Sequence, residues 1–290
     1  MSNDNQDLMH RINEKYKKMS KGQKLISEHI MNNYETAAFM TASRLGNKVG
    51  VSESTVVRFA NMLGYEGYPK LQKALQELIR NKLTTLQRIE MTSDLDESTL
   101  LKSVLKADMN NIRLTLEEVD KETFDGVVES IFSARNIYVL GLRSAAPLAQ
   151  FMGYYLSFMF DNIRLVTSGI NDILEQLVHI SPQDLLIGIS FPRYARRTVE
   201  AVTFAKGKGA KTVAITDTIL SPLTSYADYI LLARSDMASF VDSLVAPLSL
   251  INALIVALGL RKKADISSGF MELERIWDEY QVYLSKDRST

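Results

Sequence analysis

The chain contains no cysteine, which excludes disulfide bonds, thiolate nucleophiles and cysteine-ligated metals. Its three histidines, His10, His29 and His179, lie far apart and lack metal-ligand spacing, so we expect no metal site. Acidic and basic residues balance at 34 each, so no overall electrostatic field attracts nucleic acid or a membrane surface. The polar N-terminus lacks the apolar segment of a secretory signal, and we expect a cytoplasmic protein without a cofactor.

Long hydrophobic runs are also missing, with one exception. Residues Ser243–Leu260 carry no charge over 18 positions, which reaches the lower limit for a membrane span. The run nevertheless contains Pro247 and Asn252, and it follows segments typical of a water-soluble sheet. We therefore predict a buried core helix or a dimer helix, and no membrane partner.

The most informative stretch that is present is Leu45–Leu71, which has the pattern of a helix-turn-helix. A predicted helix over Ala38–Val49 is broken by Gly50, and Ser52 is placed to cap the next helix. Apolar residues in that second helix follow one helical face and should point into the core. These core residues are Val56, Phe59, Ala60 and Leu63.

The opposite face of the second helix is polar and predicts contacts with a DNA major groove. Arg58 carries the fork of donors that fits guanine or a phosphate, and Lys70 fits a phosphate. The predicted DNA-binding residues are Ser52, Ser54, Thr55, Arg58, Asn61 and Lys70. The alternative is an ordinary solvated helix face. Residues 1–80 hold twelve Lys and Arg against eight Asp and Glu, which agrees with DNA binding but is weak evidence alone.

The second half of the chain alternates short apolar runs with helical stretches. This alternation predicts a parallel sheet with helices on both faces. The predicted strands are Ile137–Leu140, Ile163–Thr167, Leu185–Ser190, Thr212–Thr216 and Tyr229–Leu232. Each of the first four is followed or ended by a small or polar residue, namely Gly141, Ser168, Ser190 and Asp217. Ligands of such sheets bind at the carboxyl ends of the strands, beside the topological switch point.

The predicted organisation has three parts. Residues 1–89 form an all-α helix-turn-helix domain, and residues 117–290 form a doubly wound, five-stranded α/β domain. Residues 90–116 connect them as a linker and helix, beginning at the polar stretch 90–98.

Two segments resemble parts of one known family. Residues 19–75, around GVSESTVVRFANMLGYEGYPKLQ, closely resemble the helix-turn-helix domain of RpiR-type bacterial regulators, and residues 136–260 resemble the sugar isomerase (SIS) domain. The resemblance implies a flavodoxin-like sheet that binds phosphosugars. SIS domains typically carry G-x-G-x-S after the first strand and S-x-S-G-x-T after the third. Here the second glycine of the first loop is Arg143, and the glycine of the second loop is Arg193.

These departures point to an anion held by arginines in place of bare backbone. The predicted ligand-binding residues are Gly141, Arg143, Ser144, Ser190, Arg193, Arg197 and Thr198. Two alternatives are that the arginines, including Arg196, pair with nearby acids or that they face a dimer partner.

Together these observations predict a transcriptional regulator that binds a palindromic double-stranded operator and senses a phosphosugar or sugar acid. We expect a homodimer or homotetramer formed through the SIS domain, with the dimer elements Phe151–Phe160, Ser243–Leu260 and Phe270–Tyr283. One alternative is a sugar-phosphate isomerase, for which Asp172, Glu175, His179 and Asp217 are available acids and bases. Another is a dimerisation domain without a ligand.

Overall fold

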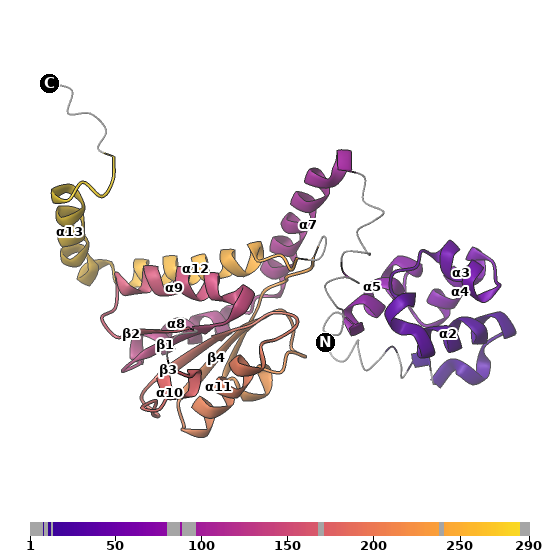
Figure 1. Ribbon diagram of the computed structural model, residues 1–290, viewed down its shortest axis with the longest axis horizontal. Coiled ribbons are helices and arrows are strands. Elements are labelled where there is room, and N and C mark those ends of the chain that lie inside the picture. The colour runs from indigo at the N-terminus through magenta and orange to yellow at the C-terminus, as the bar shows by residue number, and fades with distance from the viewer. Residues whose placement is uncertain are drawn as a thin grey trace. The chain divides into compact units, whose positions relative to one another are not determined.

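The computed structural model describes residues 8, 11–12, 14–79, 88, 97–167, 171–237 and 241–284, without the side chains of 35, 77–79, 97 and 263–269. The chain divides into two compact units, Met1–Asp94 and Leu95–Thr290 (Figure 1). Three features considered above, His10, the linker positions 90–96 and Ser168, lie outside the described residues.

The first unit is entirely helical in its described part. Its elements are η1 (Tyr16–Lys18), α2 (Lys21–Ala37), α3 (Ala42–Val49), α4 (Glu53–Met62) and α5 (Tyr68–Ile79). The four residues predicted for the core face of α4, Val56, Phe59, Ala60 and Leu63, are all buried, which confirms the pattern. They pack in a unit whose other buried residues include Ile26, Ile30, Leu45 and Leu71.

The predicted helix Ala38–Val49 is wrong at its start. The backbone N–H of Ala38 bonds Tyr34 O and closes α2, so Ala38 belongs to the end of the preceding helix. The next helix begins at Ala42 because the hydroxyl of Thr41 accepts a hydrogen bond from the backbone N–H of Arg44. The last helix of this unit, α5, begins at Tyr68.

The second unit is a five-stranded parallel sheet between helices, as predicted. Its helices are α7 (Glu97–Glu118), α8 (Lys121–Ser133), α9 (Ala146–Ser157), α10 (Ile173–Gln176), α11 (Arg196–Gly207), α12 (Val245–Arg261) and α13 (Lys263–Glu279). Its strands are β1 (Ile137–Gly141), β2 (Ile163–Val166), β3 (Leu185–Ile189), β4 (Lys211–Thr216) and β5 (Tyr229–Leu232). The strand order is β2-β1-β3-β4-β5 with all pairs parallel, which is the flavodoxin-like order.

Alternate residues of each central strand face opposite layers of helices. Ile137 and Val139 of β1 join a core with α8, α9 and α12, whereas Tyr138 and Leu140 join a second core with α10 and α11. Figure 1 shows these two helical layers on opposite sides of the sheet. Because both faces of the strands are buried, their sequences are continuous apolar runs.

The uncharged segment Ser243–Leu260 forms most of α12. Its inner face, including Leu250, Leu254 and Leu258, is buried in the core with α8 and α9, as predicted for a core helix. None of the helices in the described ranges combines the length and apolar character that crossing a bilayer requires.

Candidate nucleic-acid interface and anion site

The turn between α3 and α4 depends on two glycines. Gly50 ends α3 with a left-handed backbone, φ 75°, which L-residues with a Cβ adopt at a cost. A Cβ on Gly46 would lie 2.7 Å from the carbonyl oxygen of Val51, so only glycine lets the turn pass this close to α3. The Val51 side chain reaches the start of α2, since its Cγ1 would lie 3.3 Å from a Cβ added at Gly22. These contacts constrain how α4 packs against α3 and α2.

The start of α4 is capped by a network of hydroxyl groups. Ser52, the predicted N-cap, accepts a hydrogen bond from the Thr55 backbone N–H, and its hydroxyl lies 2.9 Å from those of Ser54 and Thr55. Arg58, one turn further, lies along the helix and donates to Ser54 O at 3.2 Å. Ser52, Ser54 and Arg58 are all exposed. The structure therefore brings four of the six predicted DNA contacts together on the outer surface of α4.

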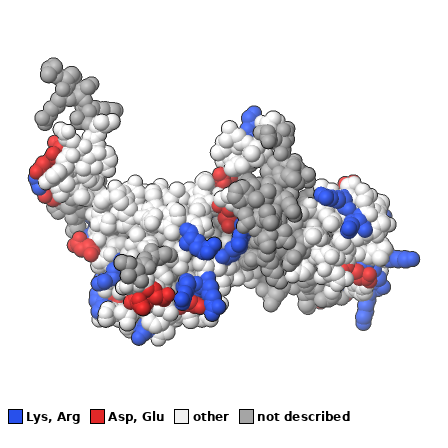
Figure 2. Space-filling view, viewed as in Figure 1, with Lys and Arg blue, Asp and Glu red and all other residues white. Residues whose placement is uncertain are grey.

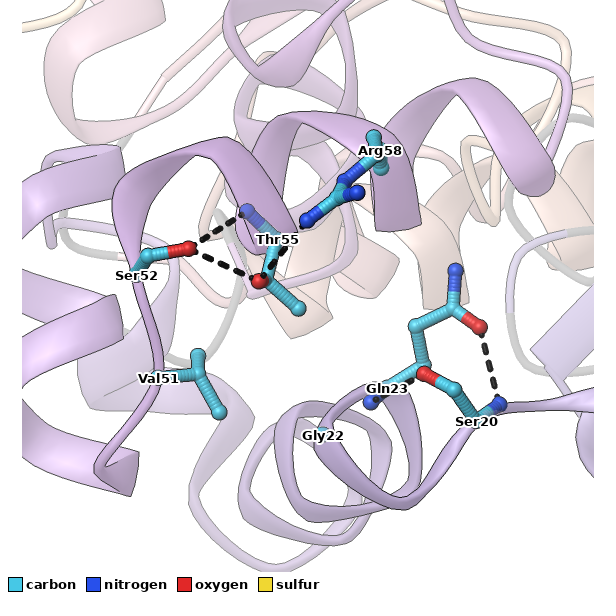
Figure 3. Close-up of a pocket in the computed structure, with 7 residues that line it drawn as sticks. All are labelled: Ser20, Gly22, Gln23, Val51, Ser52, Thr55 and Arg58. Atoms are coloured by element: carbon cyan, nitrogen blue, oxygen red, sulfur yellow. Dashed lines mark hydrogen bonds between the residues drawn. The ribbon is translucent and has the colours of Figure 1, made fainter.

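A pocket of about 520 Å³ opens beside these residues (Figure 3). It lies between the N-terminus of α2 and the N-terminus of α4, and its wall includes Arg58. Ser20 caps α2 in a reciprocal capping box with Gln23. The lining residues are Ser20, Gly22, Gln23, Val51, Ser52, Thr55 and Arg58. Two helix N-termini, each carrying positive partial charge, and one guanidinium border the same hollow, which suits a phosphate.

Ser20, Gly22 and Gln23 are absent from the residues predicted for DNA binding. The signal that could have found them is the pattern Ser-x-x-Gln at Ser20, which marks a helix start. Exposed lysines flank this start on both sides, Lys17 and Lys18 before it and Lys21 within it.

The remaining two predicted DNA contacts lie in the last turn of α4 and in α5. The side-chain oxygen of Asn61 accepts a hydrogen bond from the Gly67 backbone N–H at 3.0 Å, so this oxygen holds the loop before α5. Lys70 is exposed in the first turn of α5. Asn61 thus has a structural role in addition to the one predicted for it.

The second candidate site lies at the carboxyl ends of β1 and β3, which are neighbouring strands. Gly141 of β1 pairs in register with Ile189 of β3, so the loops that follow the two strands start side by side. The chain leaves β1 toward one layer and β3 toward the other, which makes this the topological switch point. A Cβ on Gly141 would lie 2.6 Å from the Ala145 carbonyl oxygen, so glycine is required there.

Arg143 and Arg193 both have a left-handed backbone, with φ 56° and φ 63°. Each stands at a position where SIS loops typically carry glycine. The loops therefore keep the conformation that glycine supplies, although a Cβ in this region carries a steric cost of about 1–2 kcal/mol. Both side chains are exposed. Each loop thus presents a guanidinium beside the switch point from a strained backbone.

The other residues of the second loop are buried or hydrogen-bonded. Ser190 is buried and its hydroxyl accepts from the Ala195 backbone N–H at 3.4 Å. Thr198, in the first turn of α11, is fully buried, and its Oγ1 has no hydrogen-bond partner among the residues that the structure describes. Tyr194 donates its hydroxyl proton to the carboxylate of Asp217 at 2.8 Å. In the first loop, the predicted ligand residue Ser144 is exposed.

Arg196 and Arg197 realise one of the alternatives named above, because both pair with nearby acids. Arg197 bonds Asp172 at 3.2 Å and Glu200 at 3.1 Å, and Arg196 bonds Glu200 at 2.7 Å. The hydrogen bond from Arg196, followed by the one from Arg197, holds the pKa of Glu200 below its ordinary value. The Arg197 guanidinium is thus already engaged in ion pairs.

The acids and bases considered for an isomerase have structural partners or lie on the surface. Asp172 and Glu175 form the capping box of α10, Asp217 accepts from Tyr194, and His179 is exposed. Within the described residues, no three His, Asp or Glu side chains gather as metal ligands would.

Comparison with known proteins separates the chain into two recognisable segments. Residues 6–82 match the helix-turn-helix domain of the rpiR family, and residues 130–257 match the SIS domain. An uncharacterized HTH-type transcriptional regulator of Haemophilus influenzae is 26% identical over 270 residues, which cover 90% of this chain and 93% of that protein.

Two solved structures have similar folds. The sugar isomerase domain of an RpiR transcription factor from Sphaerobacter thermophilus has a TM-score of 0.59 and 29% identity, covering 61% of this chain and 99% of that one. The Vibrio vulnificus NanR protein, complexed with ManNAc-6P, has a TM-score of 0.55 and 19% identity, covering 94% and 98% of the two chains.

Proposed function

Because the chain belongs to the family that joins an rpiR-type helix-turn-helix to a SIS domain, we propose that it is a transcriptional regulator. Its first unit binds a palindromic operator, and its second unit binds an anionic sugar derivative that alters this binding. Its place of action is then the cytoplasm, where the DNA is. The observation that carries the proposal is the pair of sites, one on each unit, built around positive charge.

The DNA proposal is supported by the outer surface of α4. Ser52, Ser54 and Arg58 are exposed at the end of the helix that enters the major groove in this motif. The pocket beside them offers two helix N-termini to a backbone phosphate, with Arg58 at its wall. We propose that the phosphate positions the first unit on the duplex and that the face of α4 reads base edges.

Replacing Arg58 by Ala tests this proposal. One lost guanidinium contact should weaken operator binding by about tenfold or more, since a bidentate base contact contributes about 1–3 kcal/mol. Binding is measured by fluorescence anisotropy on operator fragments selected from genomic DNA, at two salt concentrations. Arg275→Ala, which removes an exposed arginine of α13, is the charge-matched control. Equal affinities for the two variants would refute the assignment of α4.

The effector proposal is supported by the switch-point geometry. Arg143 and Arg193 extend from adjacent loops, and the buried Thr198 hydroxyl in the first turn of α11 has no hydrogen-bond partner among the described residues. Guanidinium groups bind carboxylates and phosphates through paired hydrogen bonds. NanR, which shares the fold, was solved with a phosphosugar. We therefore propose a phosphosugar or a sugar acid as the ligand.

A thermal-shift screen of sugar phosphates and sugar acids identifies the ligand. A true effector should raise the unfolding temperature of the wild type and change its affinity for operator DNA. Arg193→Ala should lose both responses and keep DNA binding without ligand. Arg196→Ala, whose guanidinium already pairs with Glu200, is the control and should respond like the wild type. A full response in Arg193→Ala would place the ligand elsewhere.

An NMR analysis of the ligands found by this screen distinguishes a sensor from an isomerase. We propose that the ligand leaves the protein unchanged, because Asp172 and Glu175 are held in a helix cap and Asp217 in a bond to Tyr194. Each ligand that binds is incubated with the protein and analysed by NMR. Conversion between aldose and ketose forms would favour the isomerase.

A further inference from the structure

An ordinary surface helix packs its apolar face inward and exposes its polar face, and helix α7 has the opposite arrangement. The face that packs on the second unit is small and polar, with Asn111 and Thr115 buried. Asn111 donates to Asp236 O at 2.9 Å, Thr115 accepts from the Arg234 backbone N–H at 2.8 Å, and Asp108 accepts from the hydroxyl of Ser243 at 2.6 Å. These directed bonds fix which side of the helix points inward.

The apolar face of α7 consequently points outward. Leu101 is 72% exposed, Met109 62% and Leu116 78%. We call the outer row of five side chains the α7 stripe: Leu101, Leu105, Met109, Ile112 and Leu116. Their spacing of three and four residues places them on one side of the helix over four turns. A continuous row of this kind on a surface marks a site that another protein surface covers.

The uncharged surface continues from α7 onto α12, which packs against it. The outer face of α12 exposes Val245, Leu248, Val256 and Leu260, and no residue from Ser243 to Leu260 is charged. Figure 2 shows a largely uncharged expanse over the layer formed by α9 and α12, whereas charges gather over the opposite layer. A stable dimer covers about 800 Å² on each partner, more than one helix supplies, so this second surface is needed.

We infer that the α7 stripe is the two-fold contact between two copies of this chain, with α7 antiparallel to α7 of the second copy. The stripe is symmetric about Met109 to within one residue, because Leu101 and Leu105 precede it by eight and four residues and Ile112 and Leu116 follow it by three and seven. In that pairing Leu101 meets Leu116, Leu105 meets Ile112, and Met109 meets Met109. A second copy of the chain thus supplies an apolar partner for every side chain of the α7 stripe. The sequence analysis predicts a homodimer or homotetramer. This inference places its two-fold contact on α7, which is not among the predicted dimer elements, and it does not depend on DNA or effector binding.

The charges beside the stripe agree with this orientation. On one flank, Lys102 lies seven residues before Met109 and Glu117 lies eight residues after it. Antiparallel pairing therefore brings Lys102 of each copy to Glu117 of the other. In the same pairing Arg113 faces Lys106 of the other copy. The ion pair of Arg113 with Glu117 of its own helix, at 2.7 Å, reduces both this repulsion and the attraction between Glu117 and Lys102. Antiparallel helix dipoles add to the attraction.

Cysteine cross-linking of the full chain tests the inference, because the natural sequence has no cysteine. Met109→Cys should form a disulfide-linked dimer under mild oxidation at least tenfold faster than Asn110→Cys, whose side chain lies outside the stripe. Leu116→Cys alone should cross-link slowly, but an equimolar mixture with Leu101→Cys should give the heterodimer. Equal rates for Met109→Cys and Asn110→Cys would overturn the inference, and rapid linkage of Leu116→Cys alone would overturn the antiparallel orientation.

Sedimentation velocity without DNA provides the second readout. The wild type should be a dimer or a multiple of one, and Leu105→Glu combined with Met109→Glu should reduce the assembly at micromolar concentration with an unchanged circular dichroism spectrum. Asn110→Glu adds one charge to the same helix and should sediment like the wild type. A monomeric wild type would refute the inference, whatever the DNA measurements show. So would a double variant that stays assembled.

Discussion

At the residue scale, the two loop arginines are the most unusual feature of the second unit. Arg143 and Arg193 hold left-handed backbones that glycine would hold without a steric cost. A residue kept in such a conformation is commonly found where a ligand is bound. The sequence alone indicates the change from glycine to arginine, but the retained backbone conformation is seen only in the structure.

We predict that Arg143→Gly leaves the free energy of unfolding within about 1 kcal/mol of wild type, because relief of the left-handed Cβ offsets the added freedom of glycine in the unfolded chain. Effector binding should nevertheless weaken. Arg113→Gly, in the regular helix α7, is the control and should lose about 1 kcal/mol. Urea unfolding with and without effector measures both quantities. Unaltered effector affinity in Arg143→Gly would contradict the role of this arginine.

Asp184 is a buried carboxylate directly before β3, at the amino ends of the strands and opposite the effector loops. Its side chain is fully buried and receives bonds from Arg135, Asn136 and Ser181. Burial by itself raises the pKa of Asp184, but these hydrogen bonds outweigh it and hold the pKa well below its ordinary 3.8. The carboxylate is therefore more stable in the folded chain than in the unfolded one.

This arrangement predicts a pH-dependent loss in Asp184→Ala. At pH 7 the variant should lose about 3 kcal/mol of unfolding free energy, because Arg135, Asn136 and Ser181 lose their partner. Since the folded pKa lies below the unfolded one, the stabilisation is complete above about pH 5 and declines as the pH falls further. Denaturant unfolding from pH 7 to pH 3 should show the gap to wild type narrowing. Asp161→Ala, an exposed position, should show no such gap.

At the element scale, the strands could be predicted closely and several helix features could not. The strand predicted over Tyr229–Leu232 has the observed bounds, and the others differ by one residue at an end, because buried parallel strands are short apolar runs. The error at Ala38 arose because an apolar stretch continues across the end of α2. The outward face of α7 could not be predicted, since amphipathic patterning alone places leucines inside.

The helix start at Ser52 provides a prediction that separates folding from DNA binding. Asp and Ser cap helices equally well, so Ser52→Asp should unfold within about 0.5 kcal/mol of wild type. Its carboxylate should repel phosphates and lower operator affinity at least tenfold. Ser52→Ala should lose about 1 kcal/mol of stability for want of the cap. Thermal unfolding and DNA titration of both variants measure the two effects. Full operator affinity in Ser52→Asp would exclude this end of α4 from the DNA contact.

At the scale of the whole molecule, each unit has its own core, and the second unit contains both the sheet and α7. We therefore predict that a fragment of residues 95–290 folds cooperatively, keeps the oligomeric state of the full chain and binds effector, while DNA binding is lost. Sedimentation, thermal shift and DNA titration of the fragment test this. Dissociation of the fragment to monomers would show that the first unit is required for assembly.

The polar underside of α7 also determines how that helix can respond to a metabolite. Its anchors Arg234, Asp236 and Ser243 follow β5, whose carboxyl end lies on the same side of the parallel sheet as the effector loops. Apolar contacts allow a helix to shift by small, graded amounts, whereas directed hydrogen bonds must break before the helix can move. A signal arriving at this edge should therefore move α7 between discrete positions. Because α7 also forms the inferred contact between two copies, both copies should switch together, and operator occupancy should change more steeply with metabolite concentration than it would for one independent site.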